Sequence, residues 1–302
     1  MKRKILSRET VTVVLALLLV GAIAWSPATL RAGQPTGGRK PGVKRKDTNK
    51  TMERESAAKP KVKERIKASK SAGISIPLIG EMAPAFEAVT TQGPIKFPEN
   101  YTGKWVVLFS HPADFTPVCT TEFMTFATLM PQFEALNCKL IGLSIDSNFS
   151  HIAWLRTIKE KIKYKDMENV EVTFPVIADL KMDVARKYGM VQPAADDSHA
   201  VRAVFIMDPE AKVRSVLYYP SSMGRNIPEI LRMVVALQTA EKHKVATPAD
   251  WQPGDDVIVP PPGSCGTAQD RVEGKEADKC LDWFMCLKKI PKSELDLPPM
   301  WK

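Results

Sequence analysis

Short apolar runs alternate with amphipathic segments along the middle of the chain. Residues 105–110 (WVVLFS) and 139–145 (KLIGLSI) are runs of strand-forming residues, which predicts two buried central strands. Residues 117–136 between them are predicted to form a helix. Residues 150–162 carry apolar side chains at helical spacing and lead to a further strand candidate at 172–177. Strands that alternate with helices predict an α/β domain whose sheet is largely parallel and covered on both faces.

A predicted β-hairpin and a long helix follow this alternation. Residues 200–207 and 213–219 are apolar runs on either side of residues 208–211 (DPEA), a turn with proline at a favoured position. Residues 227–240 then have the length and spacing of a helix. The hairpin is expected at one side of the sheet.

The chain becomes irregular beyond Pro248. Pro253 and the run of three prolines at residues 260–262 favour extended backbone, which predicts an arm rather than a second hydrophobic core. We therefore expect a folded domain at residues 73–240 and a C-terminal arm at residues 241–302.

The N-terminus has the features of an export signal. Basic residues at positions 2–8 precede an apolar run at residues 11–25, and Pro27 follows. The run is shorter than the roughly 20 residues that span a bilayer comfortably. Residues 1–32 are therefore predicted to be a cleaved signal peptide or a retained membrane anchor, with a buried core helix as the third interpretation. An exported protein would act in the periplasm or elsewhere outside the cytoplasm, either released or attached to the membrane.

Positive charge is concentrated near the N-terminus. The net charge is +9, but residues 1–72 hold 18 Lys and Arg against 5 Asp and Glu, and the rest of the chain holds 25 against 29. A nucleic-acid footprint should lie on a folded face, so this distribution argues against nucleic-acid binding. Residues 33–72 have few large apolar side chains, which predicts a disordered basic linker. The linker would act as a solubilising spacer or be attracted to an anionic membrane or wall surface.

The chain has five cysteines, too few for a disulfide scaffold, and none of them forms a Cys-x-x-Cys motif. Their spacing argues against a zinc ribbon and against a dithiol oxidoreductase of the thioredoxin type. Cys138 stands where a strand begins, which predicts buried packing. Cys265 lies between Ser and Gly in a predicted loop, and no role is assigned to it.

Cys119 has the most informative surroundings. It lies in residues 110–122 (SHPADFTPVCTTE), which begin at the carboxyl end of a predicted strand, where open α/β sheets place their sites. Thr116 suits a helix N-cap and Pro117 the first helical position, so Cys119 is predicted to lie in the first helical turn. Unpaired backbone N–H groups and the helix dipole there favour the thiolate, which is the nucleophilic form. The alternative is a small apolar side chain packed between helix and sheet.

Pro112, Thr116 and Cys119 form a P-x-x-x-T-x-x-C pattern that matches the signature of the peroxiredoxins, and the longer run HPADFTPVCTTE resembles their one-cysteine class. The resemblance covers roughly residues 75–290. It implies a thioredoxin-like α/β fold with a central mixed sheet flanked by helices, plus an extended C-terminal arm. It also implies a thiol peroxidase that reduces hydrogen peroxide and organic hydroperoxides without a metal or organic cofactor. Further similar stretches are residues 174–179 (FPVIAD), 202–209 (RAVFIMDP), 219–226 (YPSSMGRN) and 247–251 (TPADW).

The resemblance implies roles for the matching residues. Thr116 would donate its hydroxyl to the thiolate and to the peroxide, and Pro112 would shield the thiolate. Arg202 would keep the thiolate ionised and stabilise the charge that develops as the O–O bond breaks. His111, Arg202 and Glu122 would form the peroxide-binding set, in which Glu122 orients Arg202. Without the motif, Arg202 would be interpreted as a surface ion-pair partner.

Peroxide attack leaves a sulfenic acid on Cys119, and recycling it requires a second thiol. Residues 280–286 (CLDWFMC) resemble the C-terminal Cys-x-Asp-Trp-x-x-Cys arm of archaeal-type peroxiredoxins, which resolve through a disulfide between subunits. The resemblance implies that Cys286 of the partner subunit resolves the sulfenic acid, that Cys280 exchanges with it, and that a thioredoxin-like thiol donor reduces the enzyme again. A structural Cys280–Cys286 disulfide and half of a metal site are the competing interpretations, and the metal site is disfavoured because no histidine is near.

Two classes of function remain open at this point. One is a peroxidase that acts on hydroperoxides as a homodimer joined through the arm, or as a decamer of such dimers. The other is a non-catalytic redox-responsive holdase or surface-binding module attached by its Lys-rich tail. The complete set of Pro112, Thr116, Cys119 and Arg202 favours the enzyme, because a binding module does not need all four. A disulfide oxidoreductase is a third candidate, disfavoured by the missing Cys-x-x-Cys.

Overall fold

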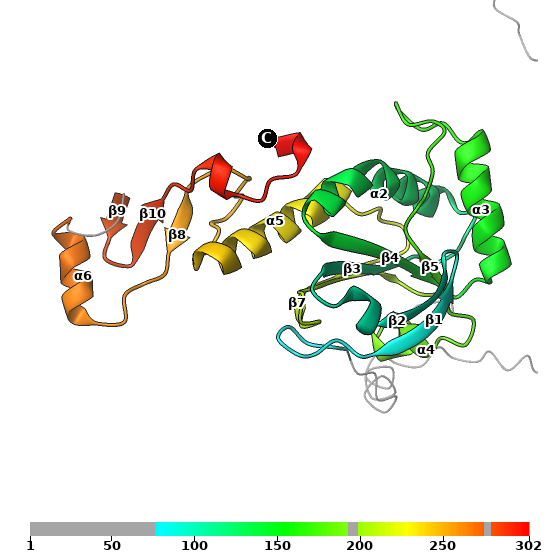
Figure 1. Cartoon of the computed structure of the whole chain (residues 1–302), viewed down its shortest axis with the longest axis horizontal. Coiled ribbons are helices and arrows are strands. Elements are labelled where there is room, and N and C mark those ends of the chain that lie inside the picture. Colours follow the sequence, from blue (N-terminus) through cyan, green and yellow to red (C-terminus); the bar gives the residue numbers. More distant parts are fainter. Residues whose placement is uncertain (1–75, 193–198, 275–278, 302) are drawn as a thin grey trace, which may run out of the picture. The chain divides into compact units, whose positions relative to one another are not determined.

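The computed structural model describes residues 76–192, 199–274 and 279–301 (Figure 1). The signal or anchor predicted at residues 1–32 and the linker predicted at residues 33–72 lie outside these ranges. No helix within the described ranges is long and apolar enough to cross a membrane.

A seven-stranded sheet forms the centre of the domain, with the strand order β2-β1-β5-β4-β3-β6-β7. The pairs β3–β4 and β4–β5 are parallel, and the other neighbouring pairs are antiparallel. The mixed sheet implied by the resemblance is therefore confirmed, whereas the largely parallel sheet expected from the alternation is wrong. An unpredicted hairpin, β1–β2, adds antiparallel pairs at one side. The strands are β1 (Phe86–Thr90), β2 (Gly93–Phe97), β3 (Trp105–Ser110), β4 (Cys138–Ser144), β5 (Val176–Ala178), β6 (Arg202–Met207) and β7 (Val213–Tyr219).

The helices follow the sequence pattern closely. Those predicted at residues 117–136, 150–162 and 227–240 are present with ends shifted by a few residues. The short helix α4 was not predicted, and the strand predicted at residues 172–177 forms only at its end, as β5. The helices around the sheet are α2 (Pro117–Ala135), α3 (Asn148–Lys161), α4 (Asp183–Lys187) and α5 (Ile227–His243), with a 3₁₀ turn at Glu99–Tyr101.

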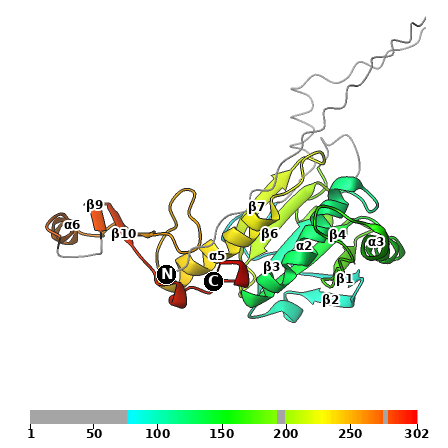
Figure 2. The ribbon, with the colours of Figure 1, turned by 90° about the horizontal axis from the view of Figure 1, so that it is seen from above.

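Side chains of β3 divide between two hydrophobic cores because successive residues of a strand face opposite sides of a sheet. Val107 and Phe109 pack with apolar residues of α2, α3 and α5. Val106 and Leu108 pack with residues of α4 and of the β1–β2 hairpin. Figures 1 and 2 show α2 and α5 together on one side of the strands. Both faces of the sheet are thus covered, as predicted.

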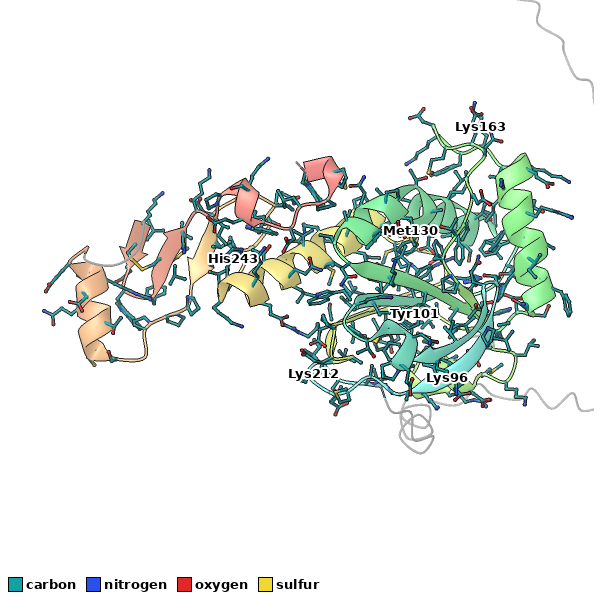
Figure 3. All side chains as sticks on the ribbon, in the orientation of Figure 1. Lys96, Tyr101, Met130, Lys163, Lys212 and His243 are labelled. Carbon is teal, nitrogen blue, oxygen red and sulfur yellow. A yellow bond between two sulfur atoms is a disulfide. The ribbon has the colours of Figure 1, made fainter. Side chains whose placement is uncertain are left out.

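The C-terminal arm has regular structure of its own. Three strands form a second sheet in the order β8-β10-β9, so the expectation of an irregular arm is wrong in this respect. The side chains of Trp251, Ile290 and Leu295 join the core of α2 and α5, and Figure 3 shows all described side chains on the ribbon. The arm's elements are β8 (Val257–Val259), α6 (Cys265–Val272), β9 (Lys279–Asp282), β10 (Met285–Lys288) and 3₁₀ turns at Lys292–Glu294 and Pro299–Trp301.

Candidate active site

The loop between β3 and α2 builds the candidate site. His111 directly follows β3, and its backbone N–H donates to the carbonyl of Leu143 on β4 at 2.9 Å. Phe115 adopts a positive φ of 55° where the loop turns toward α2. Helix α2 then begins at Pro117 with Thr116 as the N-cap residue, so Cys119 lies in its first turn, as predicted.

The Thr116 hydroxyl makes a contact that the sequence did not indicate. It does not cap the helix, although its residue occupies the N-cap position. Instead, it donates to the carbonyl of Ala113 at 2.8 Å. This bond closes the loop in front of α2, and the donation of the hydroxyl to the thiolate stays a prediction. Pro112 is buried within the same loop.

Cys119 is fully buried, and its sulfur faces a guanidinium group. Nη1 of Arg202, the first residue of β6, lies 3.3 Å from Cys119 Sγ. Arg202 is only 2% exposed, so water screens this interaction little. Both the cation and the start of the helix stabilise negative charge on the sulfur.

Glu122 and Ser221 hold the Arg202 guanidinium in place. Nη1 of Arg202 donates to Glu122 Oε2 at 2.8 Å, while Nε and Nη2 donate to the carbonyl of Ser221 at 3.0 and 2.8 Å. Glu122 lies one helical turn after Cys119, so the residue that anchors Arg202 is on the same helix as the sulfur. The predicted contact between Glu122 and Arg202 is present, whereas a contact of Glu122 with peroxide stays a prediction.

Arg225 is a second buried cation to which the sequence analysis assigned no role. Its Nε and Nη2 donate to the two oxygens of Glu122 at 3.0 and 2.7 Å, and its Nη1 donates to the carbonyls of Ser110 and Ala203. Its guanidinium also lies over the ring of Phe109. The only sequence signal was its place in the run YPSSMGRN, which names no partner. Glu122 and the two arginines together carry one excess positive charge, and a thiolate on Cys119 would balance it.

His111 belongs to a separate buried cluster next to this site. Its Nε2 lies 2.9 Å from Asp114 Oδ1, and Nδ1 of His151 lies 2.8 Å from Asp114 Oδ2. Burial lowers the pKa of His111, and the hydrogen bond with Asp114 opposes this only in part. Burial alone would raise the pKa of Asp114, but its hydrogen bonds with the two histidines outweigh that effect and lower it.

These three side chains are also the one group in the described ranges whose His, Cys, Asp or Glu atoms could hold a metal ion, with ligand atoms within 4.8 Å of one another. Each of these atoms faces a hydrogen-bond partner within the group, and that pairing accounts for the arrangement. The absence of a metal cofactor stays a prediction.

Known proteins that resemble the chain identify its family. Residues 79–216 match the AhpC/TSA family, and residues 236–275 match the C-terminal domain of 1-Cys peroxiredoxin. A peroxiredoxin of Methanosarcina mazei is 68% identical over 216 residues, which is 71% of this chain and 98% of that protein. The chain belongs to the peroxiredoxin family. It is therefore an enzyme, a thiol-dependent peroxidase, and the holdase alternative is set aside.

Other peroxiredoxins are similar in sequence and in structure. A peroxiredoxin of Aquifex aeolicus is 52% identical over 227 residues, covering 72% of this chain and 99% of that protein. The solved structure of a yeast mitochondrial 1-Cys peroxiredoxin is 41% identical with a TM-score of 0.61, over 71% of this chain and 100% of that chain. A structure of Peroxiredoxin 6 of Arenicola marina is 36% identical with a TM-score of 0.59, over 72% of this chain and 99% of that chain. The predicted thioredoxin-like peroxiredoxin fold is thus confirmed.

The other cysteines of this peroxiredoxin differ in environment. Cys138 is fully buried on β4, where burial raises the pKa of its thiol far above the usual range, as expected of a packing residue. Cys265 is exposed at the first position of α6. Cys280 on β9 and Cys286 on β10 are joined by a disulfide bond within the chain. The pairing agrees with the structural-disulfide interpretation, and attack by Cys286 on another subunit stays a prediction.

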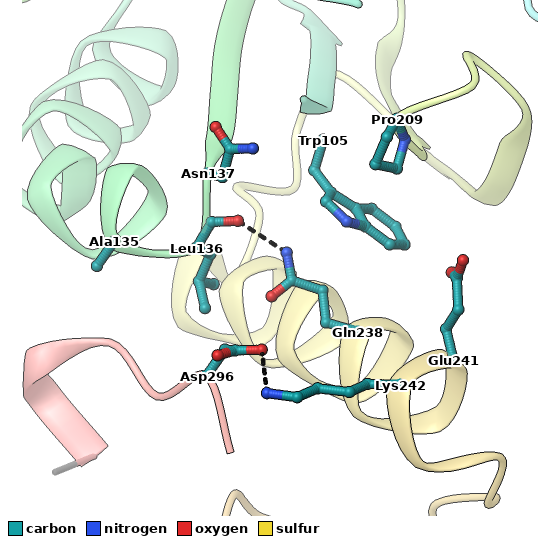
Figure 4. A pocket seen from close by; sticks show the side chains of 9 residues that line it. All are labelled: Trp105, Ala135, Leu136, Asn137, Pro209, Gln238, Glu241, Lys242 and Asp296. Atoms are coloured by element: carbon teal, nitrogen blue, oxygen red, sulfur yellow. Dashed lines mark hydrogen bonds and ion pairs between the residues drawn. The ribbon is translucent and has the colours of Figure 1, made fainter. Parts of the chain in front are cut away.

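The pocket in Figure 4 lies away from the peroxiredoxin site. It has a volume of about 470 Å³ and is lined by Trp105 and Asn137, at the amino ends of β3 and β4, and by side chains of α5. The loop that leads to α2 and Cys119 leaves the opposite end of β3. Lys242 and Asp296 at the pocket pair with each other at 2.9 Å, which leaves neither charge without a partner.

Proposed function

We propose that Cys119 is the peroxide-reducing cysteine of this peroxiredoxin and that Arg202 activates it. The observation that carries the proposal is the 3.3 Å contact between Arg202 Nη1 and Cys119 Sγ inside a buried site. The thiolate attacks the terminal peroxide oxygen, so that an S–O bond forms while the O–O bond breaks. The departing oxygen takes up a proton and leaves as water or an alcohol, and Cys119 becomes a sulfenic acid.

The neighbours of Cys119 contribute to this step in different ways. Arg202 stabilises the negative charge that moves from sulfur to the departing oxygen, because its N–H groups are fixed before the reaction begins. Glu122 fixes Arg202, and Pro112 excludes water from the sulfur. Thr116 and His111 contact the hydroperoxide. The substrates are hydrogen peroxide and organic hydroperoxides.

Replacement of the sulfur tests this assignment. Cys119→Ser should abolish peroxide consumption in the presence of a thiol reductant. Cys265→Ser is the matched control, because it removes an exposed thiol and should leave the rate unchanged. Retention of most activity by Cys119→Ser would refute the proposal.

We further propose that the arm resolves the sulfenic acid in two exchanges. Cys286 of the partner subunit attacks the Cys119 sulfenic acid, which releases water and forms a disulfide between subunits. Cys280 of that same arm then attacks the Cys286 sulfur, so that Cys119 leaves as a thiolate. The product is the Cys280–Cys286 disulfide within one arm, which is the pairing present in the structure. Since Cys119 is fully buried, the first exchange requires the first turn of α2 to open.

The two arm cysteines should behave differently on non-reducing gels after one equivalent of peroxide. Cys280→Ser blocks the second exchange, so a disulfide-linked dimer should accumulate. Cys286→Ser blocks the first exchange, so no dimer band should form. Equal dimer bands in both variants would refute the assignment of Cys286.

A thiol of the thioredoxin or glutathione kind is the proposed reductant of the arm disulfide. The yeast mitochondrial 1-Cys peroxiredoxin is described as resolved through glutathione and thioredoxin systems, and a disulfide on an arm is a substrate that either could reduce.

We propose a homodimer, or a decamer of dimers, exported from the cytoplasm and released or anchored by residues 1–32. Mass spectrometry of the mature N-terminus distinguishes cleavage from anchoring, and a cytoplasmic full-length protein would refute export.

A further inference from the structure

His111, Asp114 and His151 form a buried chain of hydrogen bonds, of which the reaction proposed above uses only His111. Neither histidine is exposed, and Asp114 is 7% exposed. Asp114 accepts from His111 on one side, and His151 contacts both of its oxygens on the other, at 3.0 and 2.8 Å. Burial of two histidines and a carboxylate costs free energy, so their protonation states must be mutually compatible.

The two contacts of His151 fix its protonation. Its Nε2 lies 3.1 Å from the carbonyl oxygen of Ile177, which can only accept a hydrogen bond, so Nε2 carries a proton. Its Nδ1 lies against the Asp114 carboxylate, which also only accepts when it is ionised. Both ring nitrogens of His151 are then protonated, and His151 and Asp114 form a buried ion pair.

The ionised state of Asp114 in turn fixes His111. The carboxylate needs a proton on the His111 nitrogen that faces it, so His111 carries its proton on Nε2. The lowered pKa of Asp114 and the lowered pKa of His111 are both consistent with an ionised carboxylate beside a neutral imidazole. A neutral imidazole with a proton on Nε2 has a lone pair on Nδ1.

Nδ1 of His111 has no hydrogen-bond partner among the residues that the structure describes. The ring packs against Phe123 with centroids 4.7 Å apart. Phe123 lies four residues after Cys119 and therefore on the same face of α2, so the His111 ring contacts the helix face that carries the sulfur. A buried nitrogen with a free lone pair matches a ligand that donates a proton, and the O–H of a hydroperoxide is such a donor.

We propose that Asp114 and His151 are positioning residues that hold His111 in its Nε2-protonated form, so that Nδ1 accepts a hydrogen bond from the hydroperoxide. The proposal rests on the proposed function, since it concerns the same substrate. It assigns a task to the ion pair beyond packing: without the charge on Asp114, nothing specifies which nitrogen of His111 carries the proton.

The charged surroundings of His111 are few. Asp114 and His151 contact it or its partner directly, and the Asp146 carboxylate lies next to them. Asp146 accepts from the backbone N–H of Asp114 at 3.0 Å and from the Ser144 hydroxyl at 2.7 Å. Its negative charge acts to raise the pKa of His111, but burial of the ring outweighs this effect, so the pKa of His111 is lowered on balance.

Nitrogen-15 NMR of the histidine rings tests the protonation states directly. The chain has four histidines, which makes assignment by single substitution practical. In the reduced wild-type protein at pH 7, His151 should show two protonated nitrogens, and His111 one on Nε2. A neutral His151, or a His111 protonated on Nδ1, would refute the proposal. This result does not depend on whether the protein consumes peroxide.

The kinetic test compares two buried carboxylates. In Asp114→Asn, the side-chain amide can donate to His111 Nε2, so the proton of His111 is no longer held on that nitrogen. The second-order rate constant of Cys119 oxidation, measured by stopped-flow fluorescence, should fall about 100-fold, within the range for a misplaced proton acceptor. Asp179→Asn is the control, because Asp179 is equally buried but accepts only from backbone N–H groups of α4. It should lower stability without changing the rate.

Two further outcomes would overturn the proposal. If Asp114→Asn folds and keeps the wild-type rate constant, Asp114 has a structural role only. Stoichiometric zinc on the purified wild-type protein, absent from Asp114→Asn, would assign the three side chains to a metal site instead. If wild-type Cys119 itself fails to react with peroxide, the proposed function is refuted, while the NMR spectrum still decides the protonation states.

Discussion

The active site and the C-terminal arm hold their sulfur atoms in opposite ways. Cys119 is fully buried on α2, and a contact with the fixed guanidinium of Arg202 on β6 holds its sulfur. In the arm, Cys280 and Cys286 are held by a covalent bond between two short strands. Apolar side chains beside that bond remain exposed, among them Leu281, Trp283 and Phe284.

The difference matches what each sulfur has to do. A nucleophile needs a fixed ionic environment, and buried ion pairs provide one because a guanidinium in a dry site cannot reorient at low cost. A thiol that exchanges with successive partners must be reached by them, and Cys286 is fully buried beside its disulfide partner. The short strands of the arm can open locally at low cost, so exchange there depends on local opening rather than on a fixed ionic environment.

The largest predicted effect concerns the carboxylate shared by the two buried arginines. Glu122→Gln removes the carboxylate that Arg202 and Arg225 share in a buried site and leaves the Cys119 thiolate as their remaining negative partner, which should lower the free energy of unfolding by about 3–5 kcal/mol. Glu241→Gln is the matched control, because the Glu241 side chain is 41% exposed where it pairs with Arg214. It should cost about 1 kcal/mol or less. Urea denaturation measures both, and equal losses would contradict the contrast between buried and exposed charge.

Loss of the activating cation should come next. Arg202→Met removes the donor 3.3 Å from the sulfur and should lower the rate constant of Cys119 oxidation about 10²–10³-fold. Arg214→Met removes a guanidinium that lies over the Trp105 ring, at the other end of β3, and should leave the rate unchanged. Stopped-flow measurements with hydrogen peroxide check both variants. A wild-type rate in Arg202→Met would show that the helix start alone activates the sulfur.

The sequence predicted what depends on local pattern. The apolar runs located β3, β4, β6 and β7, and the residues at the start of α2 placed Cys119 in the first helical turn. Pattern alone did not give the sheet order, because the direction of β6 beside β3 depends on packing across 90 residues or so of chain. The hairpin β1–β2 was missed because its strands, FEAVT and GPIKF, mix polar with apolar residues and the second contains proline, which is uncommon inside strands.

Contacts between distant residues explain what was missed in the site. The resemblance supplied the pair of Arg202 and Glu122, but Arg225 reaches Glu122 from 103 positions away, and the similar stretch that contains it names no partner. In the same way, Asp114 and His151 meet across 37 positions. Single histidines and carboxylates are common in any chain, and only the folded backbone shows which of them are adjacent.

Removal of the arm disulfide should have a smaller and local effect. Cys280→Ser leaves β9 and β10 joined only by hydrogen bonds. Because the lost disulfide closes only a short loop, its removal should destabilise the hairpin by about 2 kcal/mol. Amide hydrogen exchange should become faster in β9 and β10 and stay unchanged in β3 and β4. Faster exchange throughout the central sheet would mean that the arm and the active site do not differ in the way described here.

The smallest predicted effect is on the loss of folding stability at low pH, and it again distinguishes Asp114 from its control, Asp179. The folded-state pKa of Asp114 is lowered, so its contribution is present above the unfolded value of about 3.9 and is lost as the pH falls further. The lowered pKa of His111 has the same sign and begins to destabilise below about 6.5. Asp179 has the opposite effect on stability. Burial raises the pKa of its carboxyl, so its protonation at low pH favours the folded state.

Urea midpoints between pH 3 and 8 test these signs. Asp114→Asn should flatten the part of the curve below about pH 4 and keep the decline in stability that starts near neutrality. Asp179→Asn should instead make stability fall more steeply at low pH, because it removes a group whose protonation favours the folded state. A curve for Asp114→Asn that is parallel to wild type would mean that Asp114 is not held ionised by the two histidines. The ion pair inferred for the site would then be absent, and the contrast between an ionic active site and a covalent arm would rest on Arg202, Arg225 and Glu122 alone.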